Sequence, residues 1–453
     1  MSNGVVLESA STLHGQLQRG LGRAARRAAA TPGAGEYVYD CVRRDPRWDR
    51  RCESRRLYYA RLIVDLEMPV GPVAEHLFDP SDHAYGDQAH CDRDYGDHAH
   101  GDHPDADHPD DHSDGDVWRA DLALGVLADL VRLSRREAAA PLRRYAEEGA
   151  QWFDAVEELI GLEDPALTAG LDDLVAARCD DADLDMLIPA GPNPVIETWA
   201  ARQPRIAEAL ARRREAGRAA RRATATAHGA TRRSEAELVD LVRSRGEGAI
   251  SAIFELGRRR TLALLDLAEE LLPRDESDPV PIRFSGAVCR ALRQYGPEAL
   301  PRARVWAAGG RGVCADMGVS ILARHGTRQD VPLLMDELRT ALERREWRDA
   351  ADPVEGLGRL RAGEAVPLLK SAWIETPYSY LRPRILTALT RTAPHTAESY
   401  AVEGLWDCEE GVRSEAARCA PLTRETRIRL QRLHHDDAEE TEVRTAAATR
   451  LMT

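Results

Sequence analysis

The sequence predicts an all-α fold, a right-handed superhelix of stacked helical hairpins interrupted by a disordered insert rich in histidine and aspartate. Its composition is dominated by the strong helix formers Ala, Leu, Arg and Glu, and aromatic residues make up only 5%. Its 453 residues exceed what one compact hydrophobic core usually fills. A short proline-containing motif recurs at a period that suits a pair of helices. An elongated repeat array accounts for all three observations.

The repeat is clearest in the C-terminal half of the chain. The motif DVPLL at 330–334 recurs 35 residues later as AVPLL at 365–369, and a fainter copy, ALPRA, lies at 299–303. Each copy follows an apolar helical stretch that ends near a glycine, namely Gly296, Gly326 and Gly363. Because glycine readily takes the left-handed conformation that ends a helix and proline suits the first turn of the next, each unit is predicted to be a helical hairpin.

The predicted organisation has five parts. These are a helical segment at 1–78 that caps the solenoid, a disordered insert at 79–116, a first repeat block at 117–222, a linker at 223–235 and a second repeat block at 236–453. Within the first part, Asp45 and Pro46 divide two helical stretches and are predicted to start the second helix, as its cap and its first residue.

The repeats resemble a known family. GVRSEAAR at 411–418 looks like the first-helix motif of HEAT repeats, including the phycobilisome-lyase type, and GEAVPLLKSAW at 363–373 looks like their second helix. The N-terminal part is similar to that of uncharacterised actinobacterial HEAT-repeat proteins, and the near-complete use of Arg, with Lys370 as the single lysine, is typical of a high-GC bacterium. The resemblance implies an armadillo-like solenoid. It specifies fold better than function, since the superfamily includes scaffolds, lyases and nucleic-acid enzymes.

The insert carries most of the excess negative charge. Residues 79–116 hold thirteen aspartates and one arginine, which accounts for −12 of the formal net charge of −14. Seven of the fourteen histidines lie there as well: His83, His90, His98, His100, His103, His108 and His112. Imidazole and carboxylate groups bind divalent metals, but a dedicated site needs ligands held in a fixed geometry. We expect a passive loop whose metal binding is weak and adventitious. The alternative is a metal buffer or pH-responsive tail that the protein uses.

No enzymatic signature stands out. The sequence contains no nucleophile elbow, P-loop, HExxH helix or strand-led dinucleotide fingerprint. The eight cysteines are scattered without a CxxC pair, which favours buried thiols over a zinc or redox motif. We predict no catalytic residue and no cofactor. The absence of a signal peptide and of an apolar run of about 20 residues predicts a cytoplasmic protein with no membrane partner.

Two arginine-rich stretches suggest an alternative function. An N-terminal cluster combines Arg43, Arg44, Arg47, Arg50 and Arg51 with Trp48, and a later helical stretch contains Arg212, Arg213, Arg214, Arg218, Arg221 and Arg222. Guanidinium groups beside stackable rings are what binding to a nucleic-acid backbone requires. The competing interpretation of the N-terminal cluster is that Asp40, Asp45, Asp49 and Glu53 neutralise its arginines.

The function predicted from these observations is a non-catalytic scaffold that mediates protein–protein interaction, with an unidentified protein partner. Solenoids present extended surfaces of this kind by construction. Nucleic-acid binding through the arginine-rich stretches is the alternative, and an enzyme resembling HEAT-like lyases or glycosylases is a further one.

Overall fold

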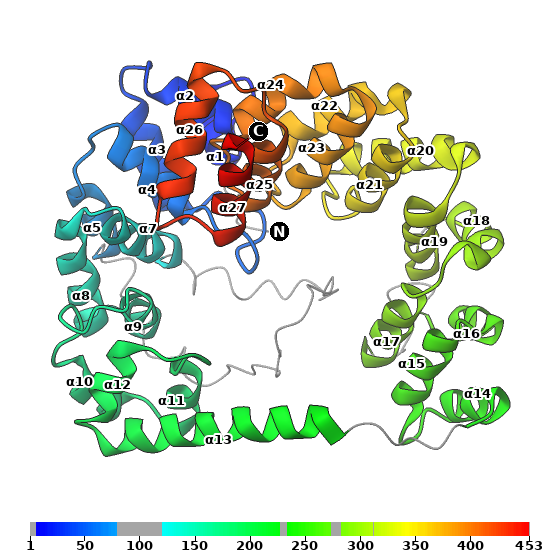
Figure 1. The fold of residues 1–453 in the computed structure, drawn as a ribbon, viewed down its shortest axis with the longest axis horizontal. Helices are drawn as coiled ribbons and strands as arrows, with labels where there is room; N and C mark the ends of the chain where they lie inside the picture. The colour runs from blue at the N-terminus through cyan, green and yellow to red at the C-terminus, as the bar shows by residue number, and fades with distance from the viewer. Residues whose placement is uncertain (1–5, 79–119, 227–232, 273–281, 311, 453) are drawn as a thin grey trace. The chain divides into compact units, whose positions relative to one another are not determined.

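The computed structural model describes residues 6–78, 120–226, 233–272, 282–310 and 312–452. This part of the chain contains 26 α-helices and no strand (Figure 1). The all-α prediction is therefore confirmed, whereas the superhelix stays a prediction. The predicted insert, with its seven histidines, and most of the predicted linker lie outside the described residues.

The chain divides into two compact units. Unit 1 contains residues 1–228, 406–413 and 429–453, and unit 2 contains residues 229–405 and 414–428. The sequence predicted a single block at 236–453, but two C-terminal segments, 406–413 and 429–453, group with the N-terminal residues. The reason is a set of contacts between residues far apart in the sequence, which no local pattern reports.

Before residue 228, the described part of unit 1 contains twelve α-helices and one 3₁₀ turn. They are α1 (Leu13–Gln18), α2 (Gly22–Ala28), α3 (Ala34–Arg44), α4 (Arg56–Asp65), α5 (Gly71–Leu77), α7 (Asp121–Arg132), the 3₁₀ turn η2 (Arg136–Ala138), α8 (Ala139–Glu148), α9 (Trp152–Ile160), α10 (Leu171–Arg178), α11 (Asp181–Leu187), α12 (Pro194–Ala200) and α13 (Pro204–Thr226). Their apolar faces meet in one core that includes the fully buried Leu17, Tyr59 and Leu127.

The C-terminal helices are α25 (Glu410–Cys419), α26 (Arg424–His435) and α27 (Thr441–Leu451). The Cys408 side chain belongs to the same apolar core as Leu17. The backbone N–H of Cys408 donates to the carbonyl of Gly20 at 2.9 Å. The two ends of the chain therefore share the packing of unit 1.

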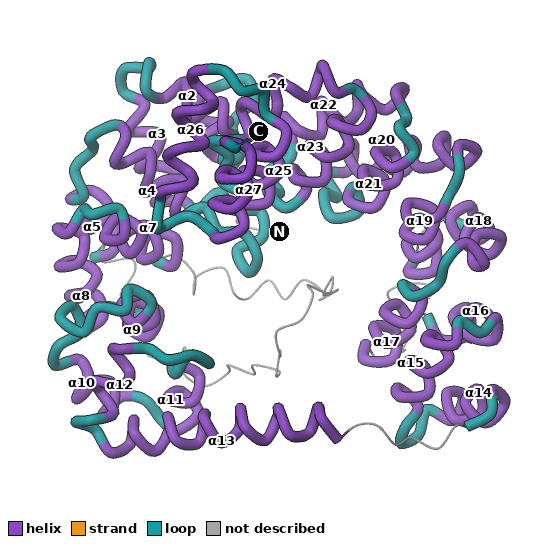
Figure 2. The backbone as a smooth tube through the Cα atoms, in the orientation of Figure 1, coloured by secondary structure: helices purple, strands orange, loops and turns teal. Residues whose placement is uncertain are grey.

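Unit 2 is built from helical hairpins in two layers. The first-helix layer contains α15 (Ala249–Arg259), α17 (Ile282–Leu292), α19 (Val313–His325), α21 (Ala351–Arg359) and α23 (Leu381–Thr392). The second-helix layer contains α14 (Glu235–Ser244), α16 (Leu262–Leu271), α18 (Leu300–Ala308), α20 (Val331–Arg344), α22 (Val366–Glu375) and α24 (Pro394–Gly404). Within the first layer, three pairs of helices pack side by side: α15 with α17, α19 with α21, and α21 with α23. Where the structure describes the connections between these helices, short loops join them (Figure 2).

The repeated proline opens the second helix of three hairpins, as predicted. Pro301, Pro332 and Pro367 each occupy the second position of their helix, in α18, α20 and α22. A 3₁₀ turn precedes each helix: η3 (Pro297–Ala299), η4 (Arg328–Asp330) and η5 (Gly363–Ala365). Proline is tolerated there because the first N–H groups of a helix have no intrahelical acceptor.

The role predicted for the neighbouring glycines is wrong. None of Gly296, Gly326 and Gly363 has a positive φ, so a left-handed helix end does not explain them. Gly326 is needed for a close approach instead, because a Cβ atom there would lie 2.4 Å from the Leu322 carbonyl oxygen. The left-handed residue near the third site is Arg361, with φ of 50°.

Glycine and alanine also set the spacing within the first layer. A Cβ atom on Gly257 would lie 2.8 Å from the Ala291 Cβ, and one on Gly358 would lie 2.7 Å from the Ala388 Cα. Both distances are shorter than ordinary van der Waals contact. Successive first helices therefore approach closely through small residues.

The helix start predicted at Asp45 and Pro46 is also wrong. Asp45 ends α3 in the left-handed conformation, with φ of 43°, and α4 begins only at Arg56. The intervening loop is held by side-chain contacts rather than by helical hydrogen bonds. Those contacts involve several of the predicted site residues.

Candidate interaction surfaces

The N-terminal arginine cluster is largely used inside unit 1. The Arg47 side chain is only 6% exposed, donates to both carboxylate oxygens of Asp45 at 2.8 and 2.7 Å, and reaches Asp121 at 2.6 Å. Arg50 contacts the Asp45 carboxylate at 3.3 Å. Burial by itself lowers the pKa of Arg47, but hydrogen bonding to Asp45 and the charge of that carboxylate raise it overall. These guanidinium groups hold the loop together and offer little to a partner.

The other members of the N-terminal cluster are more exposed. Arg44 pairs with Asp40 at 2.9 Å on the same helix, and the Arg43 guanidinium lies over the Tyr39 ring, 5.8 Å from its centroid. The backbone N–H of Arg51 donates to Asp49 at 3.0 Å. Trp48 is 40% exposed. The acidic neighbours therefore engage Arg44, Arg47 and Arg50, as the competing interpretation expects.

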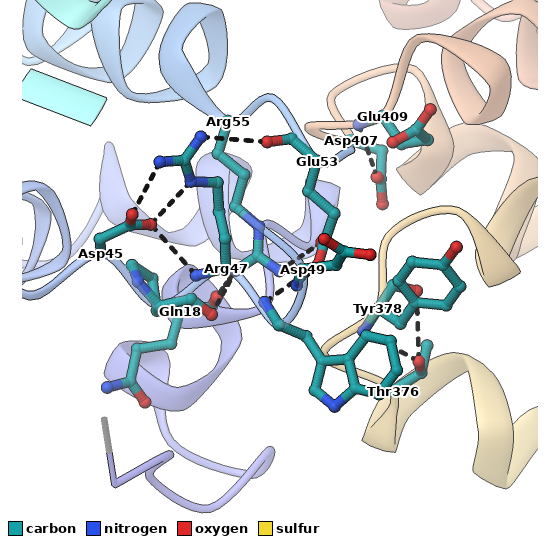
Figure 3. Close-up of polar contacts among 12 residues, drawn as sticks. Gln18, Asp45, Arg47, Asp49, Glu53, Arg55, Thr376, Tyr378, Asp407 and Glu409 are labelled. Carbon is teal, nitrogen blue, oxygen red and sulfur yellow. Dashed lines mark hydrogen bonds and ion pairs between the residues drawn. The ribbon is translucent and has the colours of Figure 1, made fainter. Parts of the chain in front are cut away.

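A buried hydrogen-bond network fixes the loop that carries Trp48 (Figure 3). The Glu53 carboxylate accepts from the backbone N–H groups of Trp48 and Asp49 at 2.9 and 2.8 Å, and from Arg55 at 2.8 Å. The side chains of Arg55 and Glu53 are both fully buried. Arg55 also donates to the carbonyls of Gln18 and Pro46. Because a buried charge needs such partners, this network explains why the loop is ordered without helical hydrogen bonds.

A second buried network joins the C-terminal segments of unit 1 to α4. Glu439 accepts two hydrogen bonds from Arg413, at 2.9 and 2.7 Å, and one from Arg61 at 3.0 Å. Arg61 also pairs with Asp436 at 2.6 Å. Burial raises the pKa of Glu439, but the Arg413 guanidinium outweighs that effect and holds the pKa at about 2. This network is structural, since Glu439 is completely covered.

The second group of predicted arginines lies on α13, apart from the first group. Helix α13 packs against α11 and α12, whereas α3 packs against α1, α4 and α5. Arg212 pairs with Asp185 at 2.9 Å and Arg214 with Glu197 at 3.1 Å. Arg213 and Arg218 are exposed. The side chains of Arg221 and Arg222 lie outside the described residues.

A third set of arginines, which the sequence analysis missed, lies in unit 2. Every helix of the first layer contains an apolar residue followed two positions later by arginine. We call the five arginines the arginine row: Arg258, Arg290, Arg324, Arg359 and Arg391. The apolar residues two positions before them, Leu256, Val288, Leu322, Leu357 and Leu389, are all fully buried. The pattern was hidden because arginine is frequent throughout the chain.

Contacts link three members of the arginine row to the chain segment before them. The Arg290 guanidinium lies 5.7 Å from the centroid of the Phe254 ring on α15. Arg324 donates to the Arg293 carbonyl at 2.7 Å, just after α17. Arg359 donates to the carbonyls of Ala323 and Gly326 at 2.8 and 2.7 Å, at the end of α19. Arg290, Arg324 and Arg359 thus reach the preceding helix of the layer or the residues at its end.

Two members of the arginine row cap helix ends. The last carbonyls of a helix lack intrahelical donors and carry partial negative charge, which a guanidinium group satisfies. Arg324 and Arg359 do this for α17 and α19. Burial lowers the pKa of both side chains. Neither forms an ion pair with a carboxylate within the described part of the chain.

The two layers of unit 2 carry opposite charge. The first layer contains nine arginines against four carboxylates, which are Glu255, Asp316, Asp352 and Glu355. The second layer contains twelve carboxylates against six basic side chains. The arginine row therefore belongs to a positively charged layer backed by a negatively charged one.

The described residues offer no metal site and no membrane-spanning element. No group of three or more His, Cys, Asp and Glu side chains among them is arranged to hold a metal ion. Across the same residues, no helix combines the length and apolar character needed to cross a bilayer. The histidines predicted as weak metal ligands are outside this part of the chain.

Comparisons with other proteins add no family to this description. No family model, no curated protein and no solved structure matches the chain.

Proposed function

We propose that this protein is a non-catalytic, HEAT-like scaffold that binds a protein partner through the first-helix layer of unit 2. The observation that carries the proposal is the arginine row, in which the five helices of the first layer repeat one side chain at one register. Repeat proteins recognise partners through surfaces built in this way, with one equivalent position contributed by each repeat.

Helix α23 illustrates the proposed binding surface of the first-helix layer, because a stripe of its side chains faces solvent. Arg384, Thr387 and Arg391 follow one another at helical spacing and none is buried. Arg384 pairs with Glu355 of α21 at 2.6 Å, so the stripe continues onto the neighbouring helix. Side chains of mixed charge spread over several helices suit a polypeptide.

Site-specific photo-crosslinking in native cells tests the proposal. A photoreactive residue replaces Thr387 on the first layer, and a matched one replaces Ser371 on α22, which is exposed in the second layer. We expect one discrete protein adduct from position 387 and none from position 371. Adducts from neither position, or the same adducts from both, would refute the proposal.

Nucleic-acid binding through α13 is the second candidate function. It is favoured by the exposed Arg213 and Arg218. Binding to an oligonucleotide should then weaken steeply with added salt and should be reduced by the double variant Arg213→Gln/Arg218→Gln. The absence of any mobility shift at low salt would exclude it.

A further inference from the structure

We propose that the arginine row binds an acidic polypeptide segment, which defines the chemistry of the partner. This inference rests on the proposed function and goes one step beyond it. Arg290, Arg324, Arg359 and Arg391 make no ion pair with a carboxylate among the described residues, whereas Arg258 pairs with Glu255 at 2.6 Å. Four guanidinium groups at one register are therefore not engaged in the ion pairs of the layer.

The central arginines are already held in place. Arg324 is fixed by the Arg293 carbonyl, and Arg359 by three carbonyls at the end of α19. A guanidinium group has five N–H donors, and the Nη1 of Arg359 donates to no described atom. Because these side chains are positioned before binding, a partner loses little side-chain entropy when it engages them.

The layer geometry predicts the spacing of acidic residues in the partner. Packed helices have axes roughly 8–10 Å apart, so one arginine per helix gives a charge about every 9 Å across the packed pairs α15 and α17, α19 and α21, and α21 and α23. An extended polypeptide advances about 3.3 Å per residue. A carboxylate at every third position of an extended segment therefore matches the spacing between arginines on packed neighbours of the layer.

The surroundings of the row favour a polypeptide over a nucleic acid. Glu255, Asp316, Asp352 and Glu355 interleave with the arginines on the same layer. A phosphate backbone, with charge at every nucleotide, would meet these carboxylates, whereas a polypeptide can place a neutral or basic residue beside each. Binding of single strands also relies on exposed rings for base stacking, and Arg290 covers the ring of Phe254.

The test uses the full chain and a fluorescent peptide that carries glutamate at every third position over about fifteen residues. A matched peptide has glutamine in place of glutamate. The row variant is Arg290→Gln/Arg391→Gln, which spares the two helix-capping arginines. The matched control is Arg339→Gln/Arg344→Gln on α20, which removes the same charge from exposed positions of the second layer.

We expect the glutamate peptide to bind in a salt-dependent manner and the row variant to weaken binding about tenfold, the equivalent of roughly two exposed ion pairs. The control variant should bind as the unaltered chain does. Equal loss in both variants, equal binding of the glutamine peptide, or tighter binding of a single-stranded oligonucleotide of the same charge would overturn the inference. If position 387 still yields its cross-link when the peptide test fails, the scaffold function stands and only the acidic chemistry is refuted.

Discussion

Replacing Gly358 by alanine tests whether small residues set the spacing of the first-helix layer. The added Cβ would lie 2.7 Å from both the Cα and the Cβ of Ala388. The Cα belongs to the backbone of α23, so no side-chain rotation can relieve the contact. Helices α21 and α23 must therefore move apart, which weakens the packing contacts between them.

The expected magnitude follows from two opposing effects. Overpacking of a well-packed interface costs about 1–3 kcal/mol. Alanine also gains about 0.5–1 kcal/mol over glycine inside a helix. The free energy of unfolding should therefore fall by about 1–2 kcal/mol.

Gly286 on α17 is the matched control. It is also helical and lies in the same layer, but a Cβ there would meet no atom within 4 Å. Gly286→Ala should therefore stabilise the protein by about 0.5–1 kcal/mol through helix propensity alone.

Hydrogen exchange followed by mass spectrometry suits this comparison, because a chain with two compact units is not expected to unfold in a single step. In Gly358→Ala the amides of α21 and α23 should exchange faster, by a factor that corresponds to the lost stability. In Gly286→Ala the amides of α17 should exchange more slowly. Changes of the same sign in both variants would refute the reasoning.

Three further predictions concern other parts of the chain. Leu369→Ala should lower the free energy of unfolding by about 2–5 kcal/mol, measured by denaturant titration. Leu368→Ala should cost clearly less, because the Leu368 side chain is partly exposed. Equal losses would show that burial at this helix is assigned wrongly. Burial raises the pKa of Glu439, but the Arg413 guanidinium outweighs burial and holds that pKa at about 2. The free energy by which the Glu439 carboxylate stabilises the fold should therefore be complete above its ordinary pKa of about 4.3 and be lost as the pH falls towards 2. Glu439→Gln should cost about 3–5 kcal/mol at neutral pH and flatten that acid-induced loss in thermal melts; an unchanged acid profile would contradict the assignment. Excision of residues 81–115 should abolish retention of the untagged protein on a nickel column and leave the helical circular dichroism signal unaltered. Retention that persists after the excision would show that other residues of the chain bind the metal.

Helix content and hairpin starts were predictable from the sequence because both depend on nearby residues. Alanine and leucine at helical spacing predict amphipathic helices, and a proline such as Pro332 or Pro367 is compatible with the first turn of a helix but not with its interior. The structure places both prolines at the second helical position. The error at Gly326 has the same origin, since a glycine required for a left-handed turn and one required for a close approach look identical in a single sequence.

The tertiary structure alone decided which charges are available to a partner. Arg47 belongs to a basic cluster in the sequence, but in the structure its side chain is nearly covered and pairs with Asp45 and Asp121. Arg61 pairs with Glu439, 378 residues away, so no local pattern could reveal that contact. The arginine row became visible only when five helices were stacked at one register. Charge pairing depends on distances in space, whereas helix formation depends mainly on neighbours in sequence, so the sequence determined the helices of this protein and the packing determined its surfaces.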